Sequence, residues 1–108
     1  MINKLLLMGN LVKDVENPSE NIARFTIAVN REYKKADGTR ECDYFNIVCW
    51  NDLAKNCLKY LSKGSKVLVD GYLENRNYQK DGETKYVMEI KARAVEFLDS
   101  KKNEEMPY

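Results

Sequence analysis

Apolar and polar residues alternate along much of the chain, and a period of two predicts β-strands. The alternation is clearest where Phe25, Ile27 and Val29 share one face of an expected strand, opposite a polar face. In the first strand, Gly9 indicates a bulge or bend. The expected strands are residues 2–12, 23–30, 43–50, 66–79 and 84–98.

One segment departs from this alternation and shows the spacing of an amphipathic helix. Its apolar residues recur at intervals that place them on one helical face. They are Leu53, Ala54, Cys57, Leu58 and Leu61. A side-chain oxygen of Asn51 or Asp52 is expected to cap the first turn, and Lys63-Gly64 is expected to end the helix.

Polar segments rich in turn-forming residues separate the expected strands. Residues 17–21 predict a loop, residues 34–41 a polar turn and residues 80–83 a hairpin turn. The order of elements is therefore three strands, one helix and two strands. That order predicts an all-β fold with one helix, the five-stranded OB-fold barrel. A βαβ unit is excluded, because hairpin-type turns join the strand pairs on both sides of the helix.

Several residues on the expected outer face of this barrel are aromatic. Strand parity places Tyr44 and Trp50 on the outer face of the third strand and Tyr78 on that of the fourth. Tyr33 lies where the second strand passes into its loop. A nucleobase is a suitable cover for such exposed rings, because every base has a π-face, so these four are the predicted base-stacking residues. Packing within the protein is expected for three others, Tyr60, Tyr72 and Tyr86.

Basic residues are interleaved with these rings. The formal net charge is only +1, so total charge does not by itself predict a nucleic-acid partner, and the placement of the cations carries the argument. Cations beside the rings are suited to following a phosphate backbone and releasing its counterions. The predicted phosphate-binding residues are Arg31, Lys34, Lys35, Arg40, Arg76, Lys80 and Lys85.

Composition narrows the remaining classes of function. A length of 108 residues predicts one domain, residues 1–98, followed by a short disordered tail, residues 99–108. Three cysteines without any histidine favour reduced, mostly buried thiols over a disulfide framework or a zinc site. The missing histidine, the scattered carboxylates and the lack of a glycine-rich phosphate loop exclude an enzyme. No metal or other cofactor is expected.

The N-terminal segment shows no targeting signal. Its apolar run, residues 5–8, stops at Gly9-Asn10 and is too short for a membrane span. We therefore expect a cytoplasmic protein, associated with the nucleoid if DNA is its ligand.

Three runs of sequence carry a resemblance to a known family. They are INKLLLMGNL (residues 2–11), YFNIVCW (residues 44–50) and YLSKGSKV (residues 60–67), of which the last is the most specific. Over residues 2–98 the chain resembles the bacterial single-stranded DNA-binding protein family. The resemblance implies a homotetramer of OB-folds that binds and protects single-stranded DNA, whatever its sequence, in replication, recombination and repair. It also places the family's main stacking positions on Tyr33, Tyr44, Trp50 and Tyr78.

Three residues differ from the pattern of that family. Glu74 stands where arginine is common, Asp52 where lysine is common, and Asn46 where arginine occurs. With fewer cations along the path of the DNA, we expect a shallow dependence of affinity on salt.

The last ten residues are polar and charged until the final three. The tip consists of Glu104, Glu105, Met106, Pro107 and Tyr108. It resembles the acidic tip with which this family recruits replication and repair proteins. In physical terms, the ring of Tyr108 suits an apolar pocket of a partner, and the two glutamates suit a basic rim around that pocket. The usual long linker is missing and Lys101-Lys102 dilutes the charge, so a frayed end without a role is the alternative.

Two other OB-fold classes stay open on the sequence. A primosome-type OB-fold protein binds mainly other replication proteins and is expected to keep fewer stacking rings, so the four aromatic residues argue against it. A purely structural OB-fold subunit binds no nucleic acid. Filter binding with a dT oligomer separates both classes from a single-stranded DNA-binding protein.

Overall fold

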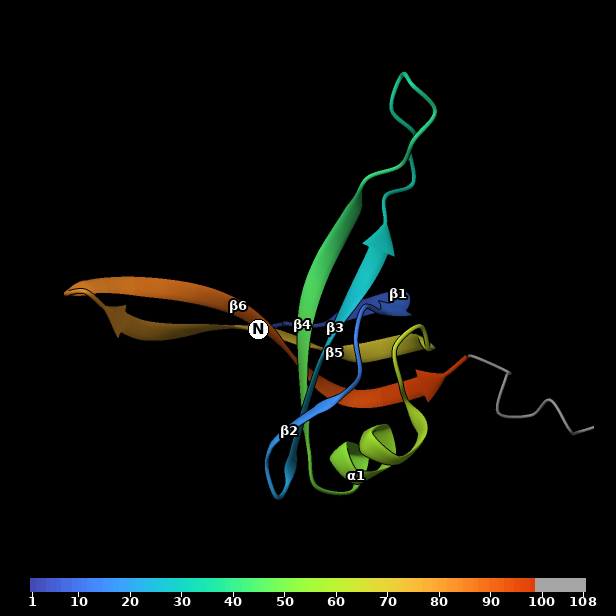
Figure 1. The fold of residues 1–108 in the computed structure, drawn as a ribbon. Coiled ribbons are helices and arrows are strands. Elements are labelled where there is room, and N and C mark those ends of the chain that lie inside the picture. The colour runs from blue at the N-terminus through green and yellow to red at the C-terminus, as the bar shows by residue number, and fades with distance from the viewer. Residues whose placement is uncertain (99–108) are drawn as a thin grey trace, which may run out of the picture.

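Five strands wrap around a common core in the computed structural model, which describes residues 1–98 (Figure 1). A short sixth strand lies at the edge of the sheet. The elements are β1 (Leu5–Leu11), β2 (Glu16–Ser19), β3 (Ile22–Asn30), β4 (Cys42–Trp50), α1 (Asn51–Tyr60), β5 (Lys66–Lys80) and β6 (Glu83–Phe97). Within residues 1–98, no helix has the length and apolar character needed to cross a membrane.

The sheet closes into a barrel because β1 pairs with strands on both of its sides. The strand order is β1-β5-β6-β4-β3-β2, and β1 also pairs with β3, where Asn10 lies opposite Ala28 and Leu11 opposite Ile27. β4 and β6 run parallel, whereas the other strand pairs are antiparallel. This arrangement confirms the predicted OB-fold barrel.

The segment expected to be a loop contributes the short strand β2 instead. β2 pairs with β3, and Ser19 lies opposite Ile22. The side-chain amide of Asn17 donates hydrogen bonds to the carbonyl groups of Ser19 and Ile22, at 2.6 and 2.7 Å, and so tightens the turn between the two strands. Pro18 is tolerated because β2 is an edge strand, where a missing N–H costs no ladder bond. The loop prediction for residues 17–21 is therefore wrong where β2 forms.

Gly9 serves close packing and does not mark the predicted bulge. β1 pairs with β5 in unbroken register. A Cβ atom at residue 9 would meet the carbonyl oxygen of Ala28 on β3, so glycine allows the close approach that closes the barrel. The register of the sheet shifts instead between β5 and β6: Asp70 pairs with Ala94 and Gly71 with Ala92, so the extra residue is Arg93 of β6.

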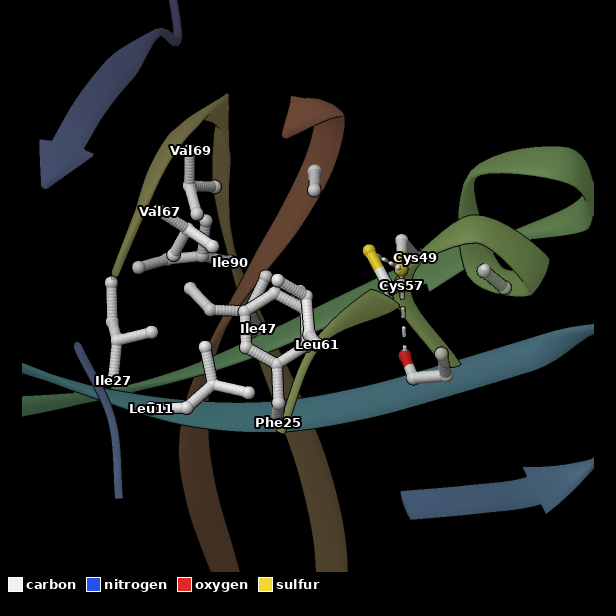
Figure 2. Close-up of a cluster of buried hydrophobic side chains, with 13 residues drawn as sticks. Leu11, Phe25, Ile27, Ile47, Cys49, Cys57, Leu61, Val67, Val69 and Ile90 are labelled. Carbon is white, nitrogen blue, oxygen red and sulfur yellow. Dashed lines mark hydrogen bonds between the residues drawn. The ribbon is translucent and has the colours of Figure 1, made fainter. Parts of the chain in front are cut away.

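The core lies inside the barrel and is built from the inward faces of β1, β3, β4, β5 and β6, together with α1 (Figure 2). Phe25 and Ile27 are fully buried, as the alternation predicts, and Val29 packs against the same cluster at the more open end of β3. The largest fully buried aliphatic side chains from the other strands are Ile47, Val67, Val69 and Ile90. Because these residues occupy the inward parity, their neighbours in each strand take the outward parity, although Val48 and Glu89 are covered there.

Two of the three cysteines complete the core where α1 meets the barrel. Cys49 of β4 and Cys57 of α1 are fully buried, and their sulfur atoms lie 3.9 Å apart (Figure 2). Cys42 is partly exposed, and all three are free thiols, as predicted. The contact with Cys49, together with burial, raises the pKa of Cys57, so this thiol stays protonated and packs as a small apolar group.

α1 packs against β3 and β4 and begins without the predicted side-chain cap. Trp50 is the N-cap residue and makes no side-chain capping bond, so the prediction that Asn51 or Asp52 caps the helix is wrong. Asn51 has a φ of 59°, and its N–H donates a 2.9 Å hydrogen bond to the carbonyl of Asn21. Asparagine tolerates this left-handed conformation better than most residues. The chain therefore turns sharply into α1 directly after Trp50.

Two projections extend away from the barrel (Figure 1). β5 and β6 stay paired as far as Lys80 and Glu83 and form a long arm. Asp81 and Gly82 have φ values of 52° and 79°, as a two-residue type I′ hairpin requires, which confirms the predicted turn. The second projection is the connection between β3 and β4, residues 31–41. Both projections carry predicted site residues beyond the core.

Candidate nucleic-acid interface

All four predicted stacking rings lie on the surface. Tyr44 and Trp50 project from β4, Tyr78 from the β5–β6 arm and Tyr33 from the β3–β4 projection. Their exposed fractions run from 37% for Trp50 to 66% for Tyr44. Within residues 1–98, no two of these rings stack on each other. They form separate platforms along the surface of the barrel and its projections.

Trp50 is the least exposed of the four rings, and a cation lies over it. The ammonium nitrogen of Lys91 on β6 is 5.2 Å from the centroid of the indole ring, within the range of a cation–π interaction. The Lys91 side chain is itself only 12% exposed. The ring is thus supported by the protein on the side where Lys91 lies.

Glu89 is a buried carboxylate that holds two cations, Lys91 beside Trp50 and Arg76 on β5. It is 4% exposed, and its carboxylate accepts a 2.7 Å hydrogen bond from Lys91 and lies 3.4 Å from Nε of Arg76. Burial by itself would raise the pKa of Glu89, but the hydrogen bond and charge of Lys91 and the charges of Arg76 and Arg24 lower it below its ordinary value. Glu89 is therefore ionised near neutral pH and compensates part of the charge of these cations.

Sequence reasoning missed Lys91 and Glu89 as parts of this site. A signal was present, because both alternate with the buried residues Ile90 and Ala92 and so share the outward parity of β6. Their position beside Trp50 depends on the parallel pairing of β4 with β6, which no local pattern reveals.

Arg31 holds the base of the β3–β4 projection together. Its Nε and Nη2 atoms donate to the two carboxylate oxygens of Asp43 at 3.0 and 2.8 Å, and Nη1 donates to Glu41 at 2.6 Å. Nη1 also donates to the hydroxyl of Tyr33 at 3.1 Å. The hydrogen bonds to Asp43 raise the pKa of Arg31 and lower that of Asp43. Arg31 therefore positions Tyr33, while two carboxylates compensate its charge.

Three more of the predicted phosphate-binding cations form ion pairs with carboxylates of the protein itself. These pairs are Lys35 with Glu41, Arg76 with Glu89 and Lys85 with Glu83, at 3.0, 3.4 and 3.0 Å. Arg40 donates instead to main-chain carbonyl groups of the projection, at 3.2 and 3.3 Å. Within the described part of the chain, Lys34, Arg40 and Lys80 make no ion pair, so their charges are the least compensated of the seven.

The three departures from the family pattern lie in different surroundings. Glu74 projects from β5 with its carboxylate 3.8 Å from the ammonium of Lys91. Asn46 accepts a 3.0 Å hydrogen bond from a neighbouring side chain on β3. Asp52 is exposed in the first turn of α1, where a negative charge favours the helix. Of these three residues, Glu74 is the one whose charge lies close to Lys91, the cation beside Trp50.

Two of the three tyrosines expected to pack contact another side chain, although Tyr60 remains 42% exposed. The Tyr60 ring lies against Phe97, with centroids 6.0 Å apart, and the guanidinium of Arg93 lies 4.5 Å from the centroid of Tyr72. The prediction is wrong for Tyr86, which is 69% exposed. β6 has left the barrel at this point and forms the arm, so no core remains to receive the ring.

Comparison with known proteins matches almost the whole of the described chain. Residues 2–98 match the single-strand binding protein family. Single-stranded DNA-binding protein 1 of Staphylococcus aureus strain MSSA476 is 43% identical over 110 residues, covering 97% of this chain and 70% of that protein. Single-stranded DNA-binding protein 2 of Streptococcus agalactiae strain NEM316 is 39% identical, covering 98% of this chain and 84% of that protein.

A solved structure shares the fold. The small single-stranded DNA-binding protein from Streptomyces coelicolor aligns with a TM-score of 0.72, over 90% of this chain and 95% of that one. Its sequence identity is 23%, so this likeness concerns the fold alone. The family match and the two bacterial relatives decide the assignment: this chain belongs to the single-strand binding protein family.

Proposed function

We propose that this chain binds and protects single-stranded DNA, whatever its sequence, during replication, recombination and repair. As a member of the single-strand binding protein family, it is a DNA-binding protein and not an enzyme, as the sequence predicts. The observation that carries the mechanism is Trp50, a large aromatic ring held at the surface of β4 with part of its area open. A ring in this position is suited to stack against an unpaired base.

Base stacking on separate rings accounts for binding without sequence preference. The four proposed stacking rings are exposed on the barrel and on both projections, so a single DNA strand can contact them one after another. They are Tyr33, Tyr44, Trp50 and Tyr78. Every base has a π-face, and stacking is worth about 1–3 kcal/mol per base in proteins of this class. Single-stranded nucleic acid offers these faces, whereas a duplex keeps its bases stacked on one another.

Cations along the same surface guide the phosphate backbone. Lys34 and Arg40 lie on the β3–β4 projection and Lys80 at the end of the β5–β6 arm, all without an ion pair within residues 1–98. They are the best placed of the predicted cations to meet phosphates. The paired cations Arg31, Lys35, Arg76 and Lys85 contribute less, since a phosphate must compete with a carboxylate for each.

We further propose that the chain assembles as a homotetramer through its apolar first strand. β1 pairs with β3 only at its C-terminal end, which leaves the edge of its first half without a partner strand among residues 1–98. Leu6 and Met8 are exposed on this strand, and Phe45 of β4 is only partly buried. A free edge with exposed apolar side chains favours pairing with a second copy.

The proposal extends to the cellular location and the tail. Single-stranded DNA arises at the nucleoid, so we propose a cytoplasmic, nucleoid-associated protein whose binding domain is residues 1–98. The predicted tail, residues 99–108, and its tip, residues 104–108, lie outside the described residues. We propose the tip as a contact for replication or repair proteins, on its sequence alone.

Titration of the intrinsic fluorescence of Trp50 with poly(dT) tests the function. Trp50 is the only tryptophan, so its emission reports on this platform alone, and we expect strong quenching at saturation. Trp50→Ala should weaken binding by about 1–3 kcal/mol, as measured by the anisotropy of a labelled dT oligomer. Trp50→Phe keeps a ring and serves as the matched control, with affinity close to that of the unchanged protein. Unchanged emission at saturating poly(dT) contradicts the proposed role of Trp50.

A further inference from the structure

Lys91 contacts Trp50 but also has a second set of contacts that fixes its position. Its ammonium lies 5.2 Å from the centroid of the indole ring, 2.7 Å from the carboxylate of Glu89 and 3.8 Å from that of Glu74. The Lys91 side chain is 12% exposed and that of Glu89 is 5% exposed. A lysine with two carboxylates and a ring around its charge is held in one place, unlike a surface lysine that moves freely in water.

The contact also divides the ring into two unequal faces. A cation over the face of an indole ring occupies the region that a base would need for stacking on that side. The residue that carries this cation is anchored in β6, whereas the ring belongs to β4. The exposed 37% of Trp50 is therefore the area that remains for a ligand.

We propose that Lys91 is a positioning residue for DNA binding, which holds the Trp50 ring in place and makes it a platform with one usable face. This inference rests on the proposed function for its effect on DNA, but the contact itself exists in the free protein. Glu89 acts through Lys91, because its carboxylate holds the ammonium beside the ring. Lys91 does not serve as a phosphate contact, because two carboxylates already compensate its charge.

The platform has a defined stoichiometry under this proposal. One base stacks on the open face of Trp50, and no second base inserts on the side of Lys91. An indole ring that is already fixed in the free protein loses less conformational freedom when a base stacks on it, so binding is tighter than for a ring that rotates freely.

Fluorescence of the DNA-free protein tests the contact directly. Lys91→Ala should lower the steady-state anisotropy of Trp50 and increase its quenching by acrylamide, because the covered face becomes open. Lys91→Arg should restore both values, since guanidinium also stacks on indole. Lys59→Ala is the matched control: Lys59 lies 5.2 Å from the centroid of the Tyr60 ring, so this variant loses the same kind of contact away from Trp50. It should leave both values unchanged.

A second variant keeps the test valid if Lys91→Ala disturbs the fold. Glu89→Gln removes the charge that holds the ammonium and should shift anisotropy and quenching in the same direction by a smaller amount. Far-ultraviolet circular dichroism identifies folded variants. If folded variants at both positions leave the Trp50 signals as they were, the proposed support of the ring is wrong.

DNA binding then separates a positioning role from a phosphate contact. We expect Lys91→Ala to raise the Kd for poly(dT) roughly three- to tenfold, while the slope of log affinity against log salt stays the same. A slope reduced by about 0.7 overturns the proposal, since that is the loss expected for one phosphate contact. If even the unchanged protein fails to bind poly(dT), the proposed function fails, yet the measurements on DNA-free protein still decide whether Lys91 positions Trp50.

Discussion

The guanidinium of Arg31 and the carboxylate of Asp43 face each other through two parallel hydrogen bonds, 3.0 and 2.8 Å long. This two-pronged geometry joins the chain just after β3 to the start of β4 and directs the remaining nitrogen of Arg31 towards Glu41 and Tyr33. The sequence predicts a phosphate contact at Arg31. Because two carboxylates compensate its charge and its Nη1 atom donates to Tyr33, we propose that Arg31 acts on DNA mainly through the position of Tyr33.

The first prediction separates Arg31 from its neighbour Lys34. Arg31→Ala should weaken binding of poly(dT), because Tyr33 loses a supporting hydrogen bond, but should leave the slope of log affinity against log salt unchanged. Lys34→Ala should reduce that slope by about 0.7, since Lys34 makes no ion pair among the described residues. Titrations over a series of salt concentrations measure both slopes. An equal reduction for both variants means that Arg31 contacts phosphate.

The second prediction concerns Glu74, which stands near the cation beside Trp50. Glu74→Arg replaces a negative charge 3.8 Å from Lys91 with a positive one, and should raise the affinity for poly(dT) and steepen its salt dependence by about 0.7. Glu96→Arg makes the same charge change at an exposed position of β6 and is the matched control. If the two variants change affinity and salt dependence equally, only the total charge of the protein matters, and Glu74 lies away from the bound DNA.

The third prediction is a pH dependence of stability that depends on Glu89. Its pKa is lowered in the folded protein, so the unfolded chain takes up a proton first as the pH falls. The stability that ionised Glu89 contributes is therefore present above its ordinary pKa of 4.5 and is lost as the pH falls from there through the lower, folded value. Thermal unfolding followed from pH 7 to pH 3 should show this loss.

Glu89→Gln provides the comparison for that profile. The variant should unfold at lower temperature at pH 7, with a loss on the order of 1–3 kcal/mol, because Lys91 and Arg76 lose their charged partner. Its stability should fall less steeply with pH below 4.5, since the titrating group is gone. Parallel profiles for the two proteins would assign the acid sensitivity to other carboxylates, such as Asp43.

The fourth prediction concerns assembly through β1. Sedimentation equilibrium at micromolar protein should give a mass four times that of the 12.6 kDa chain. Leu6→Lys should shift the protein towards smaller species, because a charge then lies on the exposed apolar side of the free strand, where Leu6 is 61% exposed. Circular dichroism checks that the variant is folded. A 12.6 kDa species for the unchanged protein refutes the tetramer.

The fifth prediction concerns the tip, residues 104–108. Its deletion should leave the affinity for poly(dT) unchanged or slightly higher, because Glu104 and Glu105 no longer compete with phosphate. The same deletion should abolish capture of replication and repair proteins by the immobilised protein. If the full chain and the truncated chain capture the same proteins, the tip is a frayed end.

Local patterns in the sequence were sufficient to predict the helix, the five strands of the barrel and the exposed positions of three of the four proposed stacking rings. The period of two along Phe25, Ile27 and Val29 reflects burial of one strand face, which acts within a few residues. The same parity placed Tyr44 and Trp50 outward, because an alternation that points its apolar residues into a core must point the others away from it. The type I′ hairpin at residues 81–82 was equally local, since turn type depends on the residues of the turn.

Contacts between strands that are distant in sequence were decided only by the tertiary structure. Lys91 meets Trp50 because β6 lies parallel to β4, and a one-residue change in that register would turn Lys91 to the other face. Arg31 pairs with Asp43 because the two ends of the β3–β4 projection converge. The cation that the sequence predicts as a phosphate contact therefore already has a carboxylate partner. Tyr86 is exposed because its strand leaves the barrel. Periodicity records which face of a strand a residue occupies, whereas the partner it finds there depends on how the strands are paired and where the barrel ends.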